Sequence, residues 1–135
     1  MFEKMSKIID GKIIVNVTPH PLTFLSKSGE TVVVPTSVPE GERTSPWVVN
    51  ATAVEKPIGG DLVTTVFLPT PEGEAILDGI ERWAEEQQYN VRIIGSIIAA
   101  QAYPGRILNV IPAPGFERVP PGKKRMTTEK FTVFK

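Results

Sequence analysis

The stretch VRIIGSIIAAQAYPGRILNVIP, from Val91 to Pro112, decides the fold because it is the longest apolar segment with few charges in the chain. Its only charged residues are Arg92 and Arg106. We expect a strand, a short helix, a turn and a second strand, which together form a spine against which the rest of the chain packs.

The order of residue types within this segment supports that expectation. Residues 91–94 are mostly β-branched and favour a buried strand. Ser96 is a suitable N-cap, and the alanine-rich residues 97–102 favour one or two helical turns. Tyr-Pro-Gly at 103–105 ends the helix, and residues 107–111 return as a strand that could pair in parallel with the first. Two long strands without the helix stay open as an alternative, because short apolar runs cannot be assigned by periodicity alone.

One amphipathic helix is expected from Pro71 to about Gln88. Thr70 is its N-cap, proline suits the first helical position, and Glu72 and Glu74 lie where the helix dipole favours acidic groups. Helical spacing places the following apolar residues on one face: Ile76, Leu77, Ile80, Trp83 and Ala84.

The remaining segments read as short strands joined by turns and loops. We expect strands within 8–17, 22–25, 31–34, 47–54, 62–68 and 131–134, a turn at 55–60, a frayed or docking tail at 1–7, an exposed loop and candidate lid at 35–46, and a basic loop at 113–126. Together these elements predict a single compact α+β domain over residues 1–135. It would have a mixed or mostly antiparallel sheet of about six or seven short strands, one amphipathic helix and one short helix.

Composition limits the classes of function. The 135 residues are 41% hydrophobic and 22% charged, which suits one globular domain. The absence of cysteine excludes disulfides and thiolate metal sites, and one histidine excludes a multi-histidine metal site within one chain. No apolar run approaches the roughly 20 residues of a membrane span, and the N-terminus has no signal-peptide core. We therefore expect a cytoplasmic protein that does not contact a membrane.

Charge is balanced over the chain but unevenly placed. Residues 1–90 contain 7 Lys and Arg against 13 Asp and Glu, a net charge of −6, whereas residues 91–135 contain 8 against 2, a net charge of +6. This asymmetry indicates a dipolar surface, a basic face that attracts an anion, or two faces that attract each other in an oligomer. A nucleic-acid partner is not expected, because the chain has no overall basic excess.

Several residues are candidates for a binding site. His20 lies between two prolines that hold it rigidly, which suits a ligand contact or a general base, although a packed loop residue is the simpler alternative. Arginines can grip phosphate with two hydrogen bonds, and aromatic rings can stack on a base, although salt bridges to Glu81, Glu85 or Glu117 and core packing are the simpler alternatives. The predicted ligand-binding residues are His20, Arg92, Arg106, Tyr103, Phe116, Arg118 and Arg125, with Lys123 and Lys124 extending the basic rim. No catalytic residue, metal site or cofactor motif is predicted, because no nucleophile elbow, Walker loop or dinucleotide fingerprint is present.

The motif Asn16-Val17-Thr18-Pro19-His20-Pro21 resembles a group of small bacteriophage and prophage proteins that begin with a strand followed by N-[LV]-T-P-H. The segment from Ile94 to Gly105 is also similar to phage proteins of this kind. The resemblance covers about the first quarter and the spine, and the group has no established activity to carry over. It implies a phage context and the cytoplasm of an infected host cell.

From these observations we expect a small phage-encoded binding protein that forms a homo-oligomer and carries out no catalysis. It would capture an anionic small molecule, such as a nucleotide-type immune signal, and so counter host defence. The alternative is a structural or accessory phage protein that assembles through its sheet edges without a ligand. A third option is an enzyme that uses His20.

Overall fold

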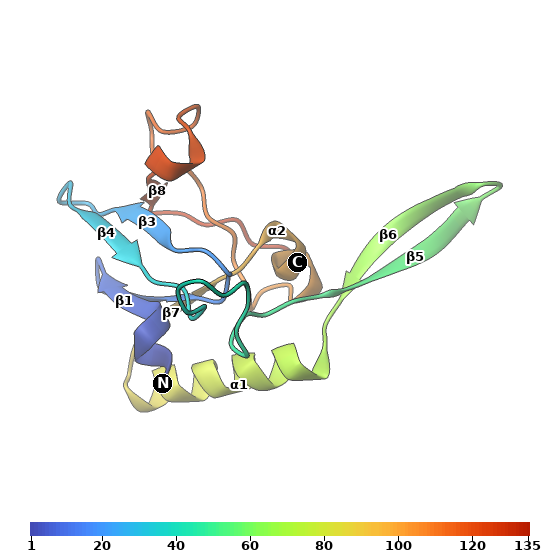
Figure 1. Ribbon diagram of the computed structural model, residues 1–135, viewed down its shortest axis with the longest axis horizontal. Coiled ribbons are helices and arrows are strands. Elements are labelled where there is room, and N and C mark those ends of the chain that lie inside the picture. The colour runs from blue at the N-terminus through green and yellow to red at the C-terminus, as the bar shows by residue number, and fades with distance from the viewer.

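The computed structural model describes residues 1–135 and shows an α+β body from which one long β-hairpin projects (Figure 1). The fold class predicted from the sequence is confirmed. In chain order the elements are η1 (Phe2–Met5), β1 (Ser6–Ile9), β2 (Lys12–Asn16), β3 (Leu22–Leu25), β4 (Thr31–Val34), β5 (Thr52–Gly59), β6 (Leu62–Leu68), α1 (Pro71–Glu86), β7 (Val91–Ile94), α2 (Ile97–Ala102), η2 (Pro121–Lys123) and β8 (Met126–Thr127).

Strand β2 is the centre of the body, in a sheet with the order β1-β2-β7. It pairs with β1 antiparallel and with β7 in parallel. Both of its faces are buried: Ile13 and Val15 belong to a larger core, and Ile14 belongs to a smaller one. A strand buried on both faces needs a continuous apolar sequence, which explains why this segment shows no polar alternation.

The smaller core joins the central sheet to a second sheet with the order β4-β3-β8. Phe24 of β3 and Val34 of β4 pack against Ile14 and Ile94 of the first sheet, and all four are almost completely buried. The predicted hairpin of residues 22–25 and 31–34 is confirmed.

Helix α1 covers the other face of the central sheet, where Leu77 and Ile80 enter the larger core. The predicted N-cap is confirmed, because Thr70 Oγ1 accepts a hydrogen bond from the Gly73 N–H at 2.9 Å. Gly73 is required at this position, since a Cβ there would lie 1.9 Å from the Tyr103 hydroxyl. The first turn of the helix therefore closely approaches the end of α2.

The spine is confirmed in its first half and corrected in its second. Strand β7 and helix α2 form, and Ser96 Oγ accepts the Ala99 N–H at 3.0 Å, so the alternative of two long strands is wrong. Residues 107–111, however, make single bridges instead of a continuous strand. Leu108 pairs in parallel with Ile94, whereas Asn109 pairs with Thr132. The partner changes after one residue, so no ladder can extend.

Two further expectations are corrected at the N-terminus. Of the two alternatives for residues 1–7, the docking tail is confirmed and the frayed tail is wrong, because Phe2 and Met5 of η1 are buried in the larger core. Residues 8–17 are not one strand region, because Asp10 and Gly11 adopt positive φ angles of 51° and 79° and reverse the chain between β1 and β2. This Asp-Gly pair is the preferred sequence for a tight hairpin turn.

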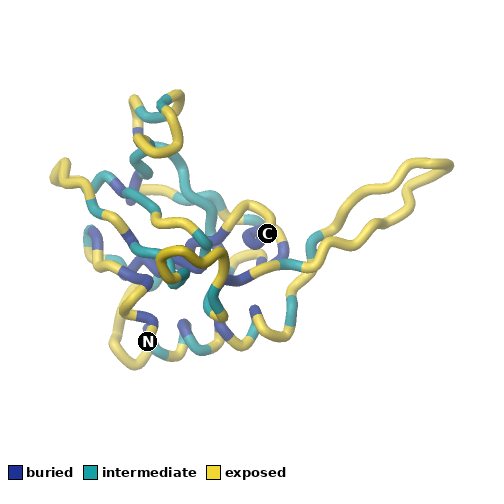
Figure 2. Tube along the Cα trace, viewed as in Figure 1, coloured by how far each residue is buried: buried dark blue, intermediate teal, exposed yellow.

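The projecting hairpin also differs from the expectation. The strand expected at 62–68 is confirmed as β6, but the strand expected at 47–54 and the turn at 55–60 are replaced by β5, which runs to a turn at Gly60 and Asp61. Pro57 suggested an earlier break, but a proline is tolerated in a strand that lies at a sheet edge. We call residues 52–68 the arm. Figure 2 shows that it is exposed along its length, and only Phe67 near its root is partly buried.

The buried phenol of Tyr103 contacts the chain at both ends of the arm. Tyr103 is 2% exposed, and its hydroxyl accepts the Thr70 N–H at 2.8 Å and lies 3.3 Å from the Asn50 carbonyl. Asn50 precedes the arm and Thr70 follows it, so this hydroxyl fixes where the arm leaves the body.

Replacing Tyr103 with phenylalanine should lower the free energy of unfolding by about 1–3 kcal/mol, because the Thr70 N–H loses its partner. Tyr89→Phe is the matched control, since its ring lies at the surface. Urea denaturation of both variants checks this expectation, and equal midpoints would contradict it.

The carboxylate of Asp10 gives a pH-dependent contact between the β1–β2 turn and two distant segments. It accepts hydrogen bonds from Thr128 Oγ1 and from the Lys27 N–H, and the bond from Thr128 is the main reason that the pKa of Asp10 lies below its ordinary value. A group whose pKa is lower in the folded state stabilises the protein at pH values above its unfolded-state pKa. This stabilisation is lost as the pH falls through the folded-state pKa.

The Asp10→Asn variant should therefore be less stable than the wild type near pH 7, and the difference should shrink as the pH falls below about 4. Asparagine tolerates the positive φ at this position, so the backbone turn is retained. Thermal unfolding across this pH range is the measurement. Glu129→Gln is the control because its carboxylate is exposed, and an equal pH response in both variants would refute the assignment.

Candidate functional site

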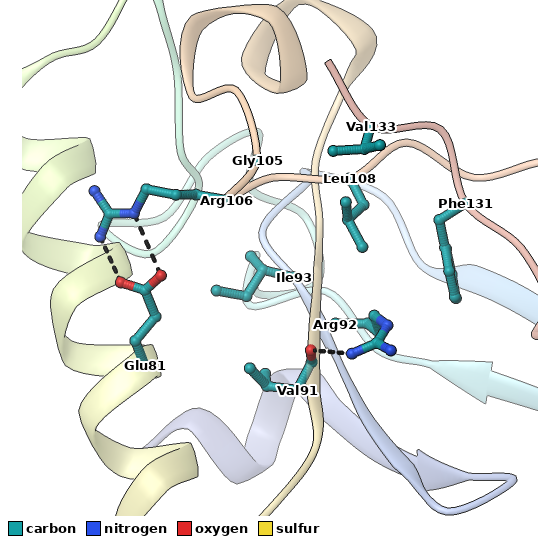
Figure 3. Close-up of a pocket in the computed structure, with 9 residues that line it drawn as sticks. All are labelled: Glu81, Val91, Arg92, Ile93, Gly105, Arg106, Leu108, Phe131 and Val133. Atoms are coloured by element: carbon teal, nitrogen blue, oxygen red, sulfur yellow. Dashed lines mark hydrogen bonds and ion pairs between the residues drawn. The ribbon is translucent and has the colours of Figure 1, made fainter. Parts of the chain in front are cut away.

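A hollow of about 470 Å³ lies along the outer edge of β7 (Figure 3). Helix α1 borders it on one side and the C-terminal segment on the other. We call it the β7 groove. Its lining residues are Glu81, Val91, Arg92, Ile93, Gly105, Arg106, Leu108, Phe131 and Val133.

The backbone of β7 presents free hydrogen-bonding groups to this groove. In the parallel pair with β2, the backbone groups of alternate β7 residues bond to β2. The backbone N–H and C=O groups of Val91 and Ile93 point to the opposite side, toward the groove. There Leu108 donates its N–H to the Ile93 carbonyl at 2.8 Å. No protein group accepts a hydrogen bond from the N–H of Val91 or Ile93, so the groove contains a short unpaired strand edge.

Arg92 is the one cation of the groove that no acidic side chain neutralises. Its Nη1 donates to Asn90 Oδ1 at 2.8 Å and to the Val91 carbonyl at 2.9 Å, and it forms no salt bridge. Its Nε and Nη2 make no hydrogen bond within the protein. These two donors could bind a carboxylate or phosphate in a fork.

Arg106 lies in the same groove but is already bound by acids of α1. Its guanidinium forms salt bridges with Glu74 at 2.6 Å, Asp78 at 2.7 Å and Glu81 at 2.5 Å. The hydrogen bond to Glu81 is the main reason that the pKa of Arg106 lies above its ordinary value, with burial opposing the shift. Three carboxylates around one guanidinium leave a net negative charge, so Arg106 ties residues 105–108 to α1 and does not offer a free charge to an anion.

The other predicted site residues lie elsewhere. Tyr103 is in the larger core, and the exposed His20 lies in the link between β2 and β3, where its carbonyl accepts the Asn16 Nδ2–H at 2.8 Å. Phe116, Arg118 and Arg125 belong to the long C-terminal loop, which lies on the side of the body opposite α1 (Figure 1). Of the predicted set, only Arg92 and Arg106 line the β7 groove.

The arm is the candidate functional element that sequence reasoning missed. Val54 lies opposite Val66, Thr52 opposite Leu68, and Lys56 opposite Thr64, so each pair shares one face of the ribbon. Strand alternation along β6 adds Leu62 to that face, and Ile58 lies at the irregularity between Pro57 and Gly59, next to the residue that pairs with Leu62. These large apolar side chains are exposed by 41% (Val54), 64% (Ile58), 62% (Leu62), 37% (Val66) and 43% (Leu68).

A period-two pattern was visible in these strands, but it indicates only that one face becomes covered. It does not show that nothing in the same chain covers it. That information required the three-dimensional arrangement, in which the arm projects away from the body (Figure 1).

A second hollow of about 540 Å³ lies between η1, residues 36–39 and Trp47, and contains none of the predicted site residues. No group of three or more His, Cys, Asp or Glu side chains is placed to hold a metal ion. No helix combines the length and apolar character needed to cross a membrane. Comparisons with protein-family models, with curated proteins and with solved structures find no match for the chain.

Proposed function

We propose that the protein is a non-catalytic assembly component that attaches to a protein partner through the arm. This is the alternative function that the sequence left open. The observation that supports it is the uncovered apolar face of β5 and β6, with side chains such as Ile58 and Leu62 more than 60% exposed.

The low stability of an isolated hairpin supports a partner protein that covers the apolar face of the arm. A two-stranded ribbon alone in water is marginally stable at best, because it has too little packed surface. Burying apolar surface contributes roughly 25 cal/mol per Å², so a partner that covers this face stabilises both itself and the arm. A contiguous apolar patch of this kind is characteristic of an interaction surface.

The backbone of the arm supports the same proposal. β5 and β6 pair only with each other, so each leaves one row of N–H and C=O groups without a strand partner. Such an edge can be extended by a strand of another chain. β6 contains no proline and keeps every N–H group, whereas β5 lacks one at Pro57, so β6 is the more complete edge. The resemblance of the Asn16–Pro21 motif to phage proteins supports a role in phage assembly.

The double variant Ile58→Lys and Leu62→Lys should abolish association with the partner, because two charges replace the most exposed apolar side chains of the arm. Its melting temperature should stay close to that of the wild type, since neither side chain contributes to a core. Size-exclusion chromatography with light scattering measures the association.

Thr65→Lys is the matched control, because Thr65 is exposed on the opposite face of the same arm. It should associate as the wild type does. If the double variant associates as well as this control, the arm is not the attachment surface.

A second candidate function is the capture of an anionic small molecule in the β7 groove. The observation that favours it is the uncompensated guanidinium of Arg92, with two open donors beside apolar walls. The carboxylates around Arg106 weigh against it, since they give that side of the groove a negative charge.

If the groove captures such a molecule, ADP-ribose or a cyclic nucleotide should raise the melting temperature of the wild type by more than inorganic phosphate does. Arg92→Gln should remove this shift, and Arg118→Gln should retain it because Arg118 lies outside the groove. A thermal-shift series distinguishes these results. Equal responses to nucleotides and phosphate would eliminate this candidate.

A further inference from the structure

We infer that the β7 groove receives the arm of a second copy of the chain. This inference rests on the proposed function, in which the arm is an attachment surface, and it names the partner. The arm of one copy adds a strand beside β7 of the next copy and extends the β1-β2-β7 sheet outward.

The backbone groups of the two surfaces are complementary. The groove offers the unpaired N–H groups of Val91 and Ile93, and a strand placed beside them supplies carbonyl oxygens. The outer edge of β6 has an uninterrupted row of such carbonyls over Leu62–Leu68. Seven extended residues span about 23 Å, which is more than enough to cover residues 91–93, the part of the β7 edge that precedes its pairing with Leu108.

The side chains are complementary as well. Leu108, Phe131 and Val133 form an apolar wall of the groove, and Val133 is 46% exposed. An apolar wall beside a strand edge matches a ribbon with exposed apolar side chains, because the added strand pairs through its backbone while its side chains pack against the wall.

Charge supports an acidic occupant. Arg92 has no acidic partner, and the arm contains Glu55 and Asp61 against the single cation Lys56, none of which forms a salt bridge. Because Arg106 is already bound by three carboxylates of α1, Arg92 is the groove cation that Glu55 or Asp61 of an incoming arm can meet. Opposite charges steer two copies into a head-to-tail contact.

The arm of the same chain does not fill the groove. Besides its hairpin partner, β6 packs at its root against α2, and from there the arm extends away from the body (Figure 1). The 15 strand residues of the arm are also most of the 20–30 residues per side of a standard interface. Because the arm and the groove are different surfaces, the contact is heterologous and builds a ring or an open chain of copies.

A complementation experiment tests this arrangement. The arm variant is Ile58→Lys with Leu62→Lys, and the groove variant is Arg92→Glu with Val133→Glu, which places acids opposite the acids of the arm. Light scattering should show the wild type as a higher assembly and each variant alone as a monomer. An equimolar mixture should form a species of two chains, because the groove variant supplies an intact arm and the arm variant supplies an intact groove.

The controls separate this inference from the proposed function. Ile8→Glu, an exposed apolar position on β1 outside the groove, should assemble as the wild type does. Val133→Glu alone should weaken assembly, which covers the case in which the double groove variant unfolds. Circular dichroism checks the folding of every variant.

The possible failures are distinct. If the groove variants still assemble while the arm variant does not, the groove is the wrong receptor and the arm remains an attachment surface. If the arm variant assembles, both proposals are wrong. A wild type that is monomeric at every concentration, or a mixture that forms no two-chain species, overturns the inference of a second copy.

Discussion

The buried hydroxyl of Tyr103 connects three parts of the molecule that are distant in sequence. It accepts the Thr70 N–H at the start of α1, lies beside the Asn50 carbonyl before β5, and belongs to the turn that ends α2. The same ring passes so close to Gly73 that no side chain fits there. The direction of α1 and the exit of the arm are therefore set at one point, and both the apolar face of the arm and the acidic face of α1 take their positions from it.

Around this point the body is divided by β2 into two cores. Ile13 and Val15 face α1, whereas Ile14 faces the second sheet. The outer edge of β7 is paired only at its end, where Leu108 bonds to Ile93 and Gly95, so the start of that edge at residues 91–93 stays open. Arg106 closes one end of that edge by binding three carboxylates of α1, and Arg92 borders it with an uncompensated charge. The groove is thus a result of how the central sheet ends.

Local signals in the sequence predicted most of the elements. Thr70-Pro71 and Ser96 marked the two helix starts, and β-branched runs marked β2, β4, β6 and β7. Signals that depend on distant partners failed. Residues 107–111 resemble a strand but change partner at each step, and Phe2 is buried by residues that are distant in sequence, among them Trp47 and Trp83. Of the site residues, Arg92 and Arg106 lie together because they flank one strand edge, whereas Arg118 and Arg125 belong to the long C-terminal loop outside the groove.

Because both ends of the arm are fixed at Tyr103, the length and sequence of the arm can change independently of the body. Because Asn50 and Thr70 both contact the Tyr103 hydroxyl, the body can keep its fold whether the chain segment between them is long or short. Doubling the length of a flexible connection costs only about 0.6 kcal/mol in closure entropy, which is small beside the stability of a folded domain. Insertions, deletions and substitutions near the tip at Gly60 and Asp61 can therefore accumulate without disturbing either core. Related chains can diverge fastest in the reach and chemistry of this extension while they keep an unchanged globular base.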